Sequence, residues 1–160
     1  MWLGNAVIRE SGLHGKGVFS LKFVPKGRIL SVWQVREVLR EEEYLARAES
    51  EPEVRRNSVR LVGKYYGYEP GGTVPEDYIN HSYDPNLLYH VGVYIALKDI
   101  SPGEELTVDY NHYFNFDRTG HLTDRTSGAV VHGLSPKESL IRNCQAVIAL
   151  VREIENWDGN

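Results

Sequence analysis

The chain has 160 residues, of which 41% are hydrophobic and 25% are charged, proportions typical of a single soluble globular domain. Its formal net charge of −4 argues against direct nucleic-acid binding, for which a basic face would be expected. No apolar run approaches the ~20 residues that span a bilayer, and the first residues lack a signal-peptide pattern. We therefore expect no membrane association and a cytoplasmic protein, of a mass that also allows action in the nucleus.

The aromatic and thiol content is unusual. Ten tyrosines stand against four phenylalanines, so many aromatic rings carry a hydroxyl that needs a hydrogen-bond partner. The single cysteine, Cys144, excludes an internal disulfide and an all-thiolate zinc site. The acidic balance is compatible with a basic peptide as ligand.

Most of the chain predicts short strands separated by glycine and proline turns. The expected strands, in chain order, cover residues 6–9, 17–20, 28–33, 58–68, 89–97 and 105–110. An exposed amphipathic helix is expected over 38–51, where Pro52 ends it, and residues 77–90 have the composition of a loop.

The clearest helix is expected over 136–157. Ser135 is a good N-cap, Pro136 suits the first helical position, and Glu138 completes a capping box. The predicted apolar stripe consists of Leu140, Cys144, Val147, Val151 and Ile154, widened by Ile141, Ile148 and Leu150. This stripe favours docking on the sheet, with a helix–helix dimer as the alternative.

Three segments have the composition of a functional site. Residues 14–17 read His-Gly-Lys-Gly, which permits a tight turn or a close approach of the backbone to a ligand. Residues 80–86 read Asn-His-Ser-Tyr-Asp-Pro-Asn, a run rich in turn-forming polar side chains. Residues 103–111 read Gly-Glu-Glu-Leu-Thr-Val-Asp-Tyr-Asn and predict a turn followed by a half-buried strand.

The second segment also contains residues that could belong to a hydrolase or to a metal site. Ser82 with His81 as its base would make a hydrolase pair, but adjacent side chains rarely face each other and no strand–Ser–helix elbow surrounds them. His81 with Asp84 would begin a metal site, but no second ligand pair with regular spacing completes it.

In order and separation, the three segments together resemble the motifs of the SET-domain lysine methyltransferases, over about residues 6–116. The resemblance implies a mainly β fold with some helix. Small curved sheets would form a β-clip-like arrangement with a C-terminal pseudoknot, and a C-terminal helix would be added. The implied organisation is a SET domain over 1–116, with a variable insert at about 36–60. A C-terminal extension over 117–160 would pack on the same domain through its helix.

The resemblance also implies an activity: transfer of a methyl group from S-adenosyl-L-methionine to the ε-amine of lysine in a histone-like or other basic protein. S-adenosyl-L-homocysteine would be the product, and no metal is needed. Tyr110 stands where the family has its catalytic tyrosine. The implied cofactor-binding residues are Gly15, Lys16, Gly17, Asn80, His81 and Phe116. The implied substrate-channel residues are Tyr66, Tyr68, Tyr78, Val108 and Tyr113. The alternative is a catalytically silent SET-fold module that binds a basic peptide.

The sequence departs from the family pattern within these segments. Asp77-Tyr78 stands where many relatives have Arg-Phe, and Tyr83 replaces the common cysteine. Val108 is smaller than the aromatic residue often found there, which leaves the number of transferred methyl groups open.

A zinc-bound tail cannot form with Cys144 alone, so we expect residues 113–157, including the final helix, to complete the channel. The acidic insert at 36–56 is expected to contact a basic substrate or to form a solvated helix face. The expected partner is a protein or peptide with an accessible lysine. The chain itself is expected to be a monomer, or a dimer through the final helix.

Overall fold

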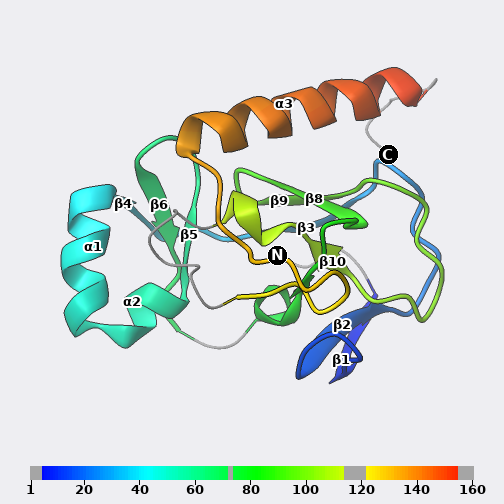
Figure 1. Ribbon diagram of the computed structural model, residues 1–160, viewed down its shortest axis with the longest axis horizontal. Helices are drawn as coiled ribbons and strands as arrows, with labels where there is room; N and C mark the ends of the chain where they lie inside the picture. The colour runs from blue at the N-terminus through cyan, green and yellow to red at the C-terminus, as the bar shows by residue number, and fades with distance from the viewer. Residues whose placement is uncertain (1–4, 72–73, 114–121, 155–160) are drawn as a thin grey trace.

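The computed structural model describes residues 5–71, 74–113 and 122–154 (Figure 1). The strands are β1 (Ala6–Glu10), β2 (Lys16–Ser20), β3 (Ile29–Val32), β4 (Glu37–Arg40), β5 (Ser58–Arg60), β6 (Tyr65–Tyr68), β7 (Asn80–His81), β8 (Leu87–His90), β9 (Val93–Ala96) and β10 (Thr107–Val108). The helices are α1 (Glu41–Ser50), α2 (Pro52–Arg56) and α3 (Pro136–Glu153), with short 3₁₀ turns η1 (Pro75–Tyr78) and η2 (Tyr110–His112).

The strands form small separate sheets in the orders β1-β2, β3-β9-β8, β4-β6-β5 and β10-β7. All pairings are antiparallel except that of β7 with β10, which are parallel. This pairing aligns Thr107 with Asn80 and Val108 with His81, so the second and third motif segments lie side by side. Such a close approach is what the expected pseudoknot requires, and the expected mainly β architecture of small sheets is confirmed.

A central hydrophobic core holds the β3-β9-β8 sheet and the motif strands together. Its fully buried members come from segments far apart in the sequence, among them Val18, Leu87, Ile100, Leu106 and Val108. Each such side chain contributes about 1.5–3 kcal/mol through removal of apolar surface from water. The core therefore fixes the positions of the motif strands.

The run over 89–97 forms a hairpin, so the prediction of one continuous strand there is wrong. β8 and β9 pair in register, and only Val91 and Gly92 connect them. Both residues have positive φ, 48° and 83°, as two-residue hairpin turns require. Gly92 was the local signal for this turn, but the β-forming residues around it concealed it.

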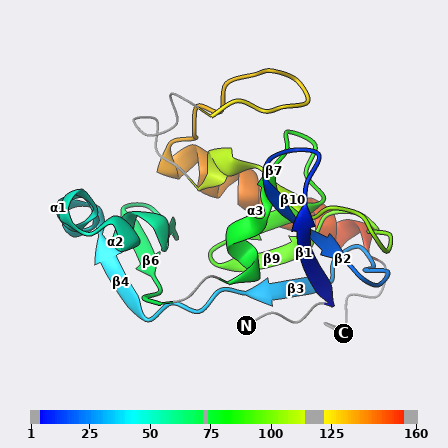
Figure 2. The same ribbon diagram turned by 90° about the horizontal axis from the view of Figure 1, so that it is seen from below.

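Residues 37–68 form a lobe of their own at one end of the molecule (Figures 1 and 2). The helix expected over 38–51 begins only at Glu41, because residues 37–40 pair with β6. Val38 is 56% exposed while Leu39 is fully buried, the alternation of a strand. Pro52 opens α2, and the run over 58–68 divides into β5 and β6. We call residues 37–68 the insert lobe.

The insert lobe has a separate hydrophobic core. Its buried members are Leu39, Tyr44, Val54, Tyr66 and Tyr68. The rings of Tyr44 and Tyr66 stack, with centroids 4.1 Å apart and planes 13° apart. These contacts attach α1 to the β4-β6-β5 sheet independently of the central core.

Helix α3 begins with the predicted capping box, in which the Glu138 N–H donates to the Ser135 hydroxyl over 3.2 Å. It ends at Glu153, and residues 155–157 of the predicted helix lie outside the described residues. Docking on a sheet is confirmed, since Leu150 packs with Leu88 of β8 and Ile95 of β9.

The face that α3 buries agrees with the predicted one only in part, since Val147, Leu150 and Ile154 pack on the sheet but other members of the stripe do not. Ser139 and Asn143 are buried, and Asn143 donates its side-chain N–H to the Tyr89 carbonyl over 3.0 Å. The imidazole of His112 contacts the Ser139 hydroxyl at 2.9 Å. These polar contacts turn the helix so that Ile141 and Ile148, expected to face the sheet, are 46% and 52% exposed.

Candidate functional site

A cavity of about 280 Å³ opens beside the parallel β7–β10 pair. It is lined by Leu13, His14, Asn80, His81, Tyr110, Leu122, Thr123, Asp124, Arg125 and Val131. Three predicted site residues, Asn80, His81 and Tyr110, therefore line one space. The other lining residues come from the N-terminal loop before β2 and from a segment between η2 and α3.

Asn80 joins the N-terminal loop to the rest of the cavity wall. Its side-chain nitrogen lies 3.1 Å from the carbonyl oxygens of His14 and Lys16, and 2.7 Å from Glu105 Oε1. The same carboxylate accepts a hydrogen bond of 2.7 Å from the Ser11 hydroxyl. Asn80 and Glu105 thus hold the His-Gly-Lys-Gly segment against the cavity.

The two glycines of that segment are needed for different reasons. Gly15 has a φ of 48°, a conformation that side chains rarely adopt. A Cβ on Gly17 would lie 2.2 Å from Glu105 Oε1, far inside contact distance. None of Gly15, Lys16 and Gly17 lines the cavity. They are connected to it by the hydrogen bond from the Asn80 side chain to the Lys16 carbonyl.

His81 has one ring nitrogen satisfied and one without a partner. Nδ1 accepts the Tyr110 backbone N–H over 3.1 Å, so the proton of the neutral ring lies on Nε2. Nε2 is buried and has no hydrogen-bond partner within the described residues. It lies 4.0 Å from Asp124 Oδ2, too far for a direct hydrogen bond. A donor and an acceptor thus lie close together at the cavity wall.

Tyr110 is the first residue of η2 and contacts the cavity from the end of the third motif segment. Its hydroxyl donates a hydrogen bond of 2.6 Å to the Ile79 carbonyl. Burial raises the pKa of Tyr110 to about 12, so the phenol stays protonated near neutral pH. It can orient a ligand by hydrogen bonding, but it is not a base at that pH.

A shell of tyrosines lies behind Tyr110. The Tyr113 ring lies 5.5 Å from that of Tyr110 and meets the Tyr89 ring edge to face at 4.5 Å. The Tyr113 hydroxyl donates to that of Tyr94 over 3.1 Å. Burial raises the pKa of Tyr89, Tyr94 and Tyr113. These buried phenols therefore remain neutral and serve as aromatic packing with polar tips.

The other predicted channel residues do not line the cavity. Tyr78 packs against the central core, and Val108 is a fully buried member of it. Tyr66 and Tyr68 are buried in the core of the insert lobe and do not line this cavity, so their place in a substrate channel stays a prediction. Hydrophobic packing against α1 is the physical reason for their position in that core. Phe116 lies outside the described residues.

The segment Leu122–Val131 supplies the wall that sequence reasoning did not resolve. Asp124 is 4% exposed and accepts hydrogen bonds of 2.6 Å from both the backbone N–H and the hydroxyl of Ser127. The Ser127 hydroxyl bond is the main cause that lowers the pKa of Asp124, which keeps the carboxylate ionised. The run Asp-Arg-Thr-Ser-Gly at 124–128 was a turn signal that could have identified this loop.

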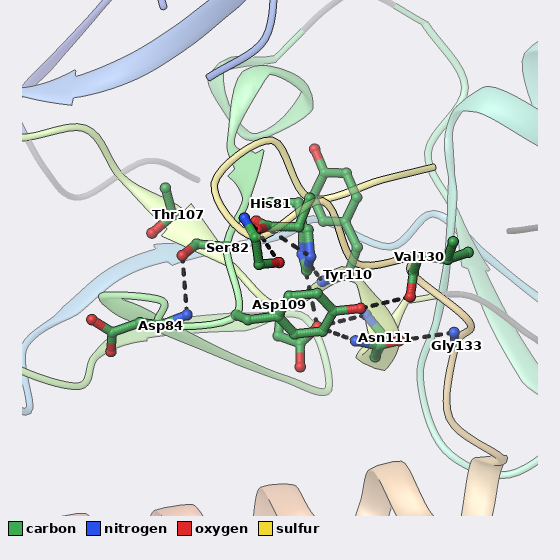
Figure 3. A network of polar contacts seen from close by, with 12 residues as sticks. His81, Ser82, Asp84, Thr107, Asp109, Tyr110, Asn111, Val130 and Gly133 are labelled. Carbon is green, nitrogen blue, oxygen red and sulfur yellow. Dashed lines mark hydrogen bonds and ion pairs between the residues drawn. The ribbon is translucent and has the colours of Figure 1, made fainter. Parts of the chain in front are cut away.

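Contacts from the motif segments fix the position of this wall (Figure 3). The Tyr83 hydroxyl donates to the Val130 carbonyl over 2.8 Å, and Asn111 Oδ1 accepts the Gly133 N–H over 2.8 Å. A further contact comes from the insert lobe, where Arg60 donates to the Leu134 carbonyl over 2.9 Å. Residues 122–131 thus reach the cavity, whereas α3, also expected to complete it, does not line it.

The hydrolase and metal readings of the second segment gain no support. The Ser82 hydroxyl accepts the Asp84 N–H over 3.0 Å, as in a turn (Figure 3). The Asp84 carboxylate pairs with Lys98 at 3.2 Å. In the part of the chain that the structure describes, no three His, Cys, Asp or Glu side chains gather as metal ligands.

No helix of the described residues is long and apolar enough to cross a membrane.

Several solved structures share this fold. In a complex titled the structure of ctPRC2 with H3K27me3 and H3K27M, one chain is 22% identical, with a TM-score of 0.57 over 84% of this chain and 17% of that one. The crystal structure of the Chaetomium thermophilum polycomb repressive complex 2 has a chain 23% identical, with a TM-score of 0.54 over 67% of this chain and 15% of that one. This chain thus spans less than a fifth of the length of either. At such identities the likeness shows the fold alone.

The family model for the SET domain matches residues 15–111, more than half of the chain. The match contains residues 15–17 of the first motif segment and the whole of the second and third, with Asn80, His81 and Tyr110 of the cavity, and it confirms the resemblance drawn from these segments. This chain therefore belongs to the SET-domain family.

Proposed function

We propose that this chain transfers a methyl group from S-adenosyl-L-methionine to the ε-amine of a lysine in a protein substrate. One observation carries the proposal: Asn80, His81 and Tyr110, from two motif segments far apart in the sequence, line a single cavity. SET-domain proteins generally catalyse this reaction with this cofactor, and the three residues lie within the range that the family model matches.

The residues of the cavity suit a ligand that combines an amino acid with a nucleoside. The unsatisfied Nε2 of His81 offers a buried hydrogen-bond donor, and the Asp124 carboxylate offers an acceptor 4.0 Å away. Asn80 would hold the N-terminal loop, whose Leu13 and His14 line the cavity, against the ligand. When bound, the cofactor supplies a methyl group that its positively charged sulfur has already activated.

The chain's own contribution is to position and desolvate the lysine amine. Proper alignment of reacting groups can lower a barrier by about 7–11 kcal/mol. A free lysine has a pKa of about 10.4, and an apolar, aromatic wall lowers it by disfavouring the charged form. The protonated Tyr110 hydroxyl can orient the amine through its oxygen, but it does not take the amine's proton. Tyr110 is therefore not proposed as the base that takes this proton.

The negative charge of this chain favours a basic protein as its substrate. Glu42, Glu43 and Glu49 of α1 are exposed on the insert lobe, and the whole chain carries a net charge of −4. Acidic surfaces attract basic peptides and speed their encounter. The solved relative in complex with H3K27me3 and H3K27M makes a histone-like tail the first substrate to test.

The test is methyl transfer followed by mass spectrometry. The protein is incubated with S-adenosyl-L-methionine and a panel of basic proteins and peptides, each beside a copy in which lysines are replaced by arginine. We expect methylated lysine in at least one substrate and none in its arginine copy. Binding of S-adenosyl-L-homocysteine without transfer to any substrate would instead favour the silent peptide-binding module.

A further inference from the structure

Helix α3 has a second apolar face that nothing in the described structure covers. Ile141 is 46% exposed, Ile148 is 52% exposed and Val151 is 40% exposed, and Cys144 between them is also exposed. The opposite face, with Ser139, Asn143 and Leu150, already packs on β8 and β9 and is not part of this surface. α3 runs along the upper edge of the molecule in Figure 1, with no other element above it.

The spacing of the exposed face is that of a coiled-coil seam. Ile141, Cys144, Ile148 and Val151 follow one another by three, four and three residues, as positions a and d of a heptad do. We call these four residues the α3 seam. A seam of this kind packs against the same kind of seam on another helix.

The charges beside the seam select the orientation of such a pair. On the exposed flank, Glu138, Gln145 and Arg152 recur every seven residues. In an antiparallel pair about a two-fold axis, Glu138 faces Arg152 of the second copy and Gln145 faces its own counterpart. Opposite charges at these flanking positions favour that orientation. The capping box uses only Oε2 of the Glu138 carboxylate.

The same axis also matches the apolar layers. Ile141 meets Val151 of the second copy, and Cys144 meets Ile148, so every seam residue is covered. In a parallel pair, Leu140 of one copy would face Gln145 of the other, and Val147 would face Arg152. That arrangement would place apolar side chains against polar ones and would form no pair of opposite charges. The sequence of this one helix is therefore complementary to itself only in the antiparallel direction.

We propose that the α3 seam is the interface of a homodimer, in which α3 packs antiparallel against α3 of a second copy. A two-fold symmetric interface needs one patch that complements itself, which this surface provides. The seam is separate from the cavity, since α3 does not line it. The dimer therefore forms without cofactor or substrate, and its test does not depend on the proposed function.

The first experiment measures oligomeric state by sedimentation across a wide dilution series. The wild type should show a concentration-dependent dimer, and Ile148→Glu should remain a monomer with an unchanged circular dichroism spectrum. Ala149→Glu, next to it on α3 and exposed but off the seam, is the matched control and should still dimerise. A wild type that is monomeric throughout, or a dimer that Ile148→Glu leaves intact, would overturn the proposal.

Cross-linking then tests the orientation. In a Cys144→Ser background, Gln145→Cys should form a covalent dimer on oxidation, because residue 145 lies beside the two-fold axis. Ala149→Cys in the same background points away from the seam and should not. Failure of Gln145→Cys to cross-link a protein that sediments as a dimer would refute the antiparallel arrangement.

Discussion

The cavity and the insert lobe are built in opposite ways. The cavity is held by polar contacts between distant segments, such as Ser11 with Glu105 and Asn80 with His14. The insert lobe is one continuous stretch, residues 37–68, and its core of Leu39, Tyr66 and their neighbours is mostly apolar. A contiguous apolar lobe can be stable through local packing, whereas the cavity exists only when the whole chain has folded.

Because of this difference, we expect substitutions in the cavity to affect function and substitutions in the core of the insert lobe to affect stability. The lining of the cavity contains hydrogen-bonding groups placed by the central core, and small chemical changes there should alter function with little effect on folding. The insert lobe offers packing and an acidic surface, so changes in its core should reduce the free energy of unfolding while leaving the cavity intact. Four predictions test this separation.

The largest effect is expected from Tyr110→Phe, which removes one hydroxyl from the cavity and keeps the ring. Loss of a positioned hydrogen-bonding group in an active site typically lowers kcat by about 100-fold or more, and we expect a loss of that size in methyl transfer. The thermal midpoint should fall by only a few degrees, because the lost hydroxyl also donates to the Ile79 carbonyl. Tyr65→Phe, on an exposed tyrosine of the insert lobe, is the control and should transfer normally. Equal activity of the two variants would remove Tyr110 from the mechanism.

The next effect concerns the insert lobe. Leu39→Ala deletes a fully buried side chain and should lower the free energy of unfolding by about 2–5 kcal/mol. Val38→Ala, its 56% exposed neighbour on β4, should change it far less. Chemical denaturation measures both. At low temperature the Leu39 variant should still bind S-adenosyl-L-homocysteine, and loss of binding there would show that the lobe and the cavity are coupled.

A smaller effect is expected from Asp124→Asn, which removes the charge at the C-terminal wall but keeps the shape. A hydrogen bond to a charged group contributes about 1.5–3 kcal/mol, so affinity for S-adenosyl-L-homocysteine should fall by at least about tenfold. The matched control, Asp84→Asn, alters a carboxylate whose side chain is 95% exposed and should bind normally. Calorimetric titration compares them. An unchanged affinity in the Asp124 variant would exclude this carboxylate from ligand binding.

The smallest effect is spectroscopic. Burial raises the pKa of Tyr110 to about 12 from an ordinary value near 10, and it raises those of Tyr89, Tyr94 and Tyr113 as well. The neutral phenol is the favoured form in the folded state. Its contribution to stability is therefore complete below pH 10 and is lost as the pH rises toward 12.

Tyrosinate absorbance measures this titration. At pH 11 the folded protein should show less tyrosinate than the denatured protein, and Tyr110→Phe should remove one of the late-titrating groups. Identical titrations of the folded and denatured chains would mean that these hydroxyls are not buried.

The sequence predicted the fold well where local chemistry determines it. The capping box at Ser135 and the glycine and proline turns follow from short-range rules, and the motif segments indicated the family. It failed where tertiary pairing overrides periodicity. Residues 37–40 form a strand because β6 lies beside them, and α3 is rotated by the buried bonds of Ser139 and Asn143.

Some residues of the candidate site could be predicted from the sequence and others could not. Asn80, His81 and Tyr110 were predicted because the motifs carry them. Asp124 was missed because its place at the cavity depends on contacts of Tyr83 and Asn111 with the segment that follows it, which no local pattern encodes. Tyr66 and Tyr68 lie in the core of the insert lobe and away from the cavity, a placement that tyrosine composition alone does not predict.

The most direct test of the central claim is calorimetric titration of the protein with S-adenosyl-L-homocysteine, for the wild type and for Asn80→Ala. We predict binding at one site per chain in the wild type and its loss in the variant, whose N-terminal loop is no longer held to the cavity. No binding to the wild type, or equal binding to both proteins, would contradict the assignment of this cavity to the methyl donor.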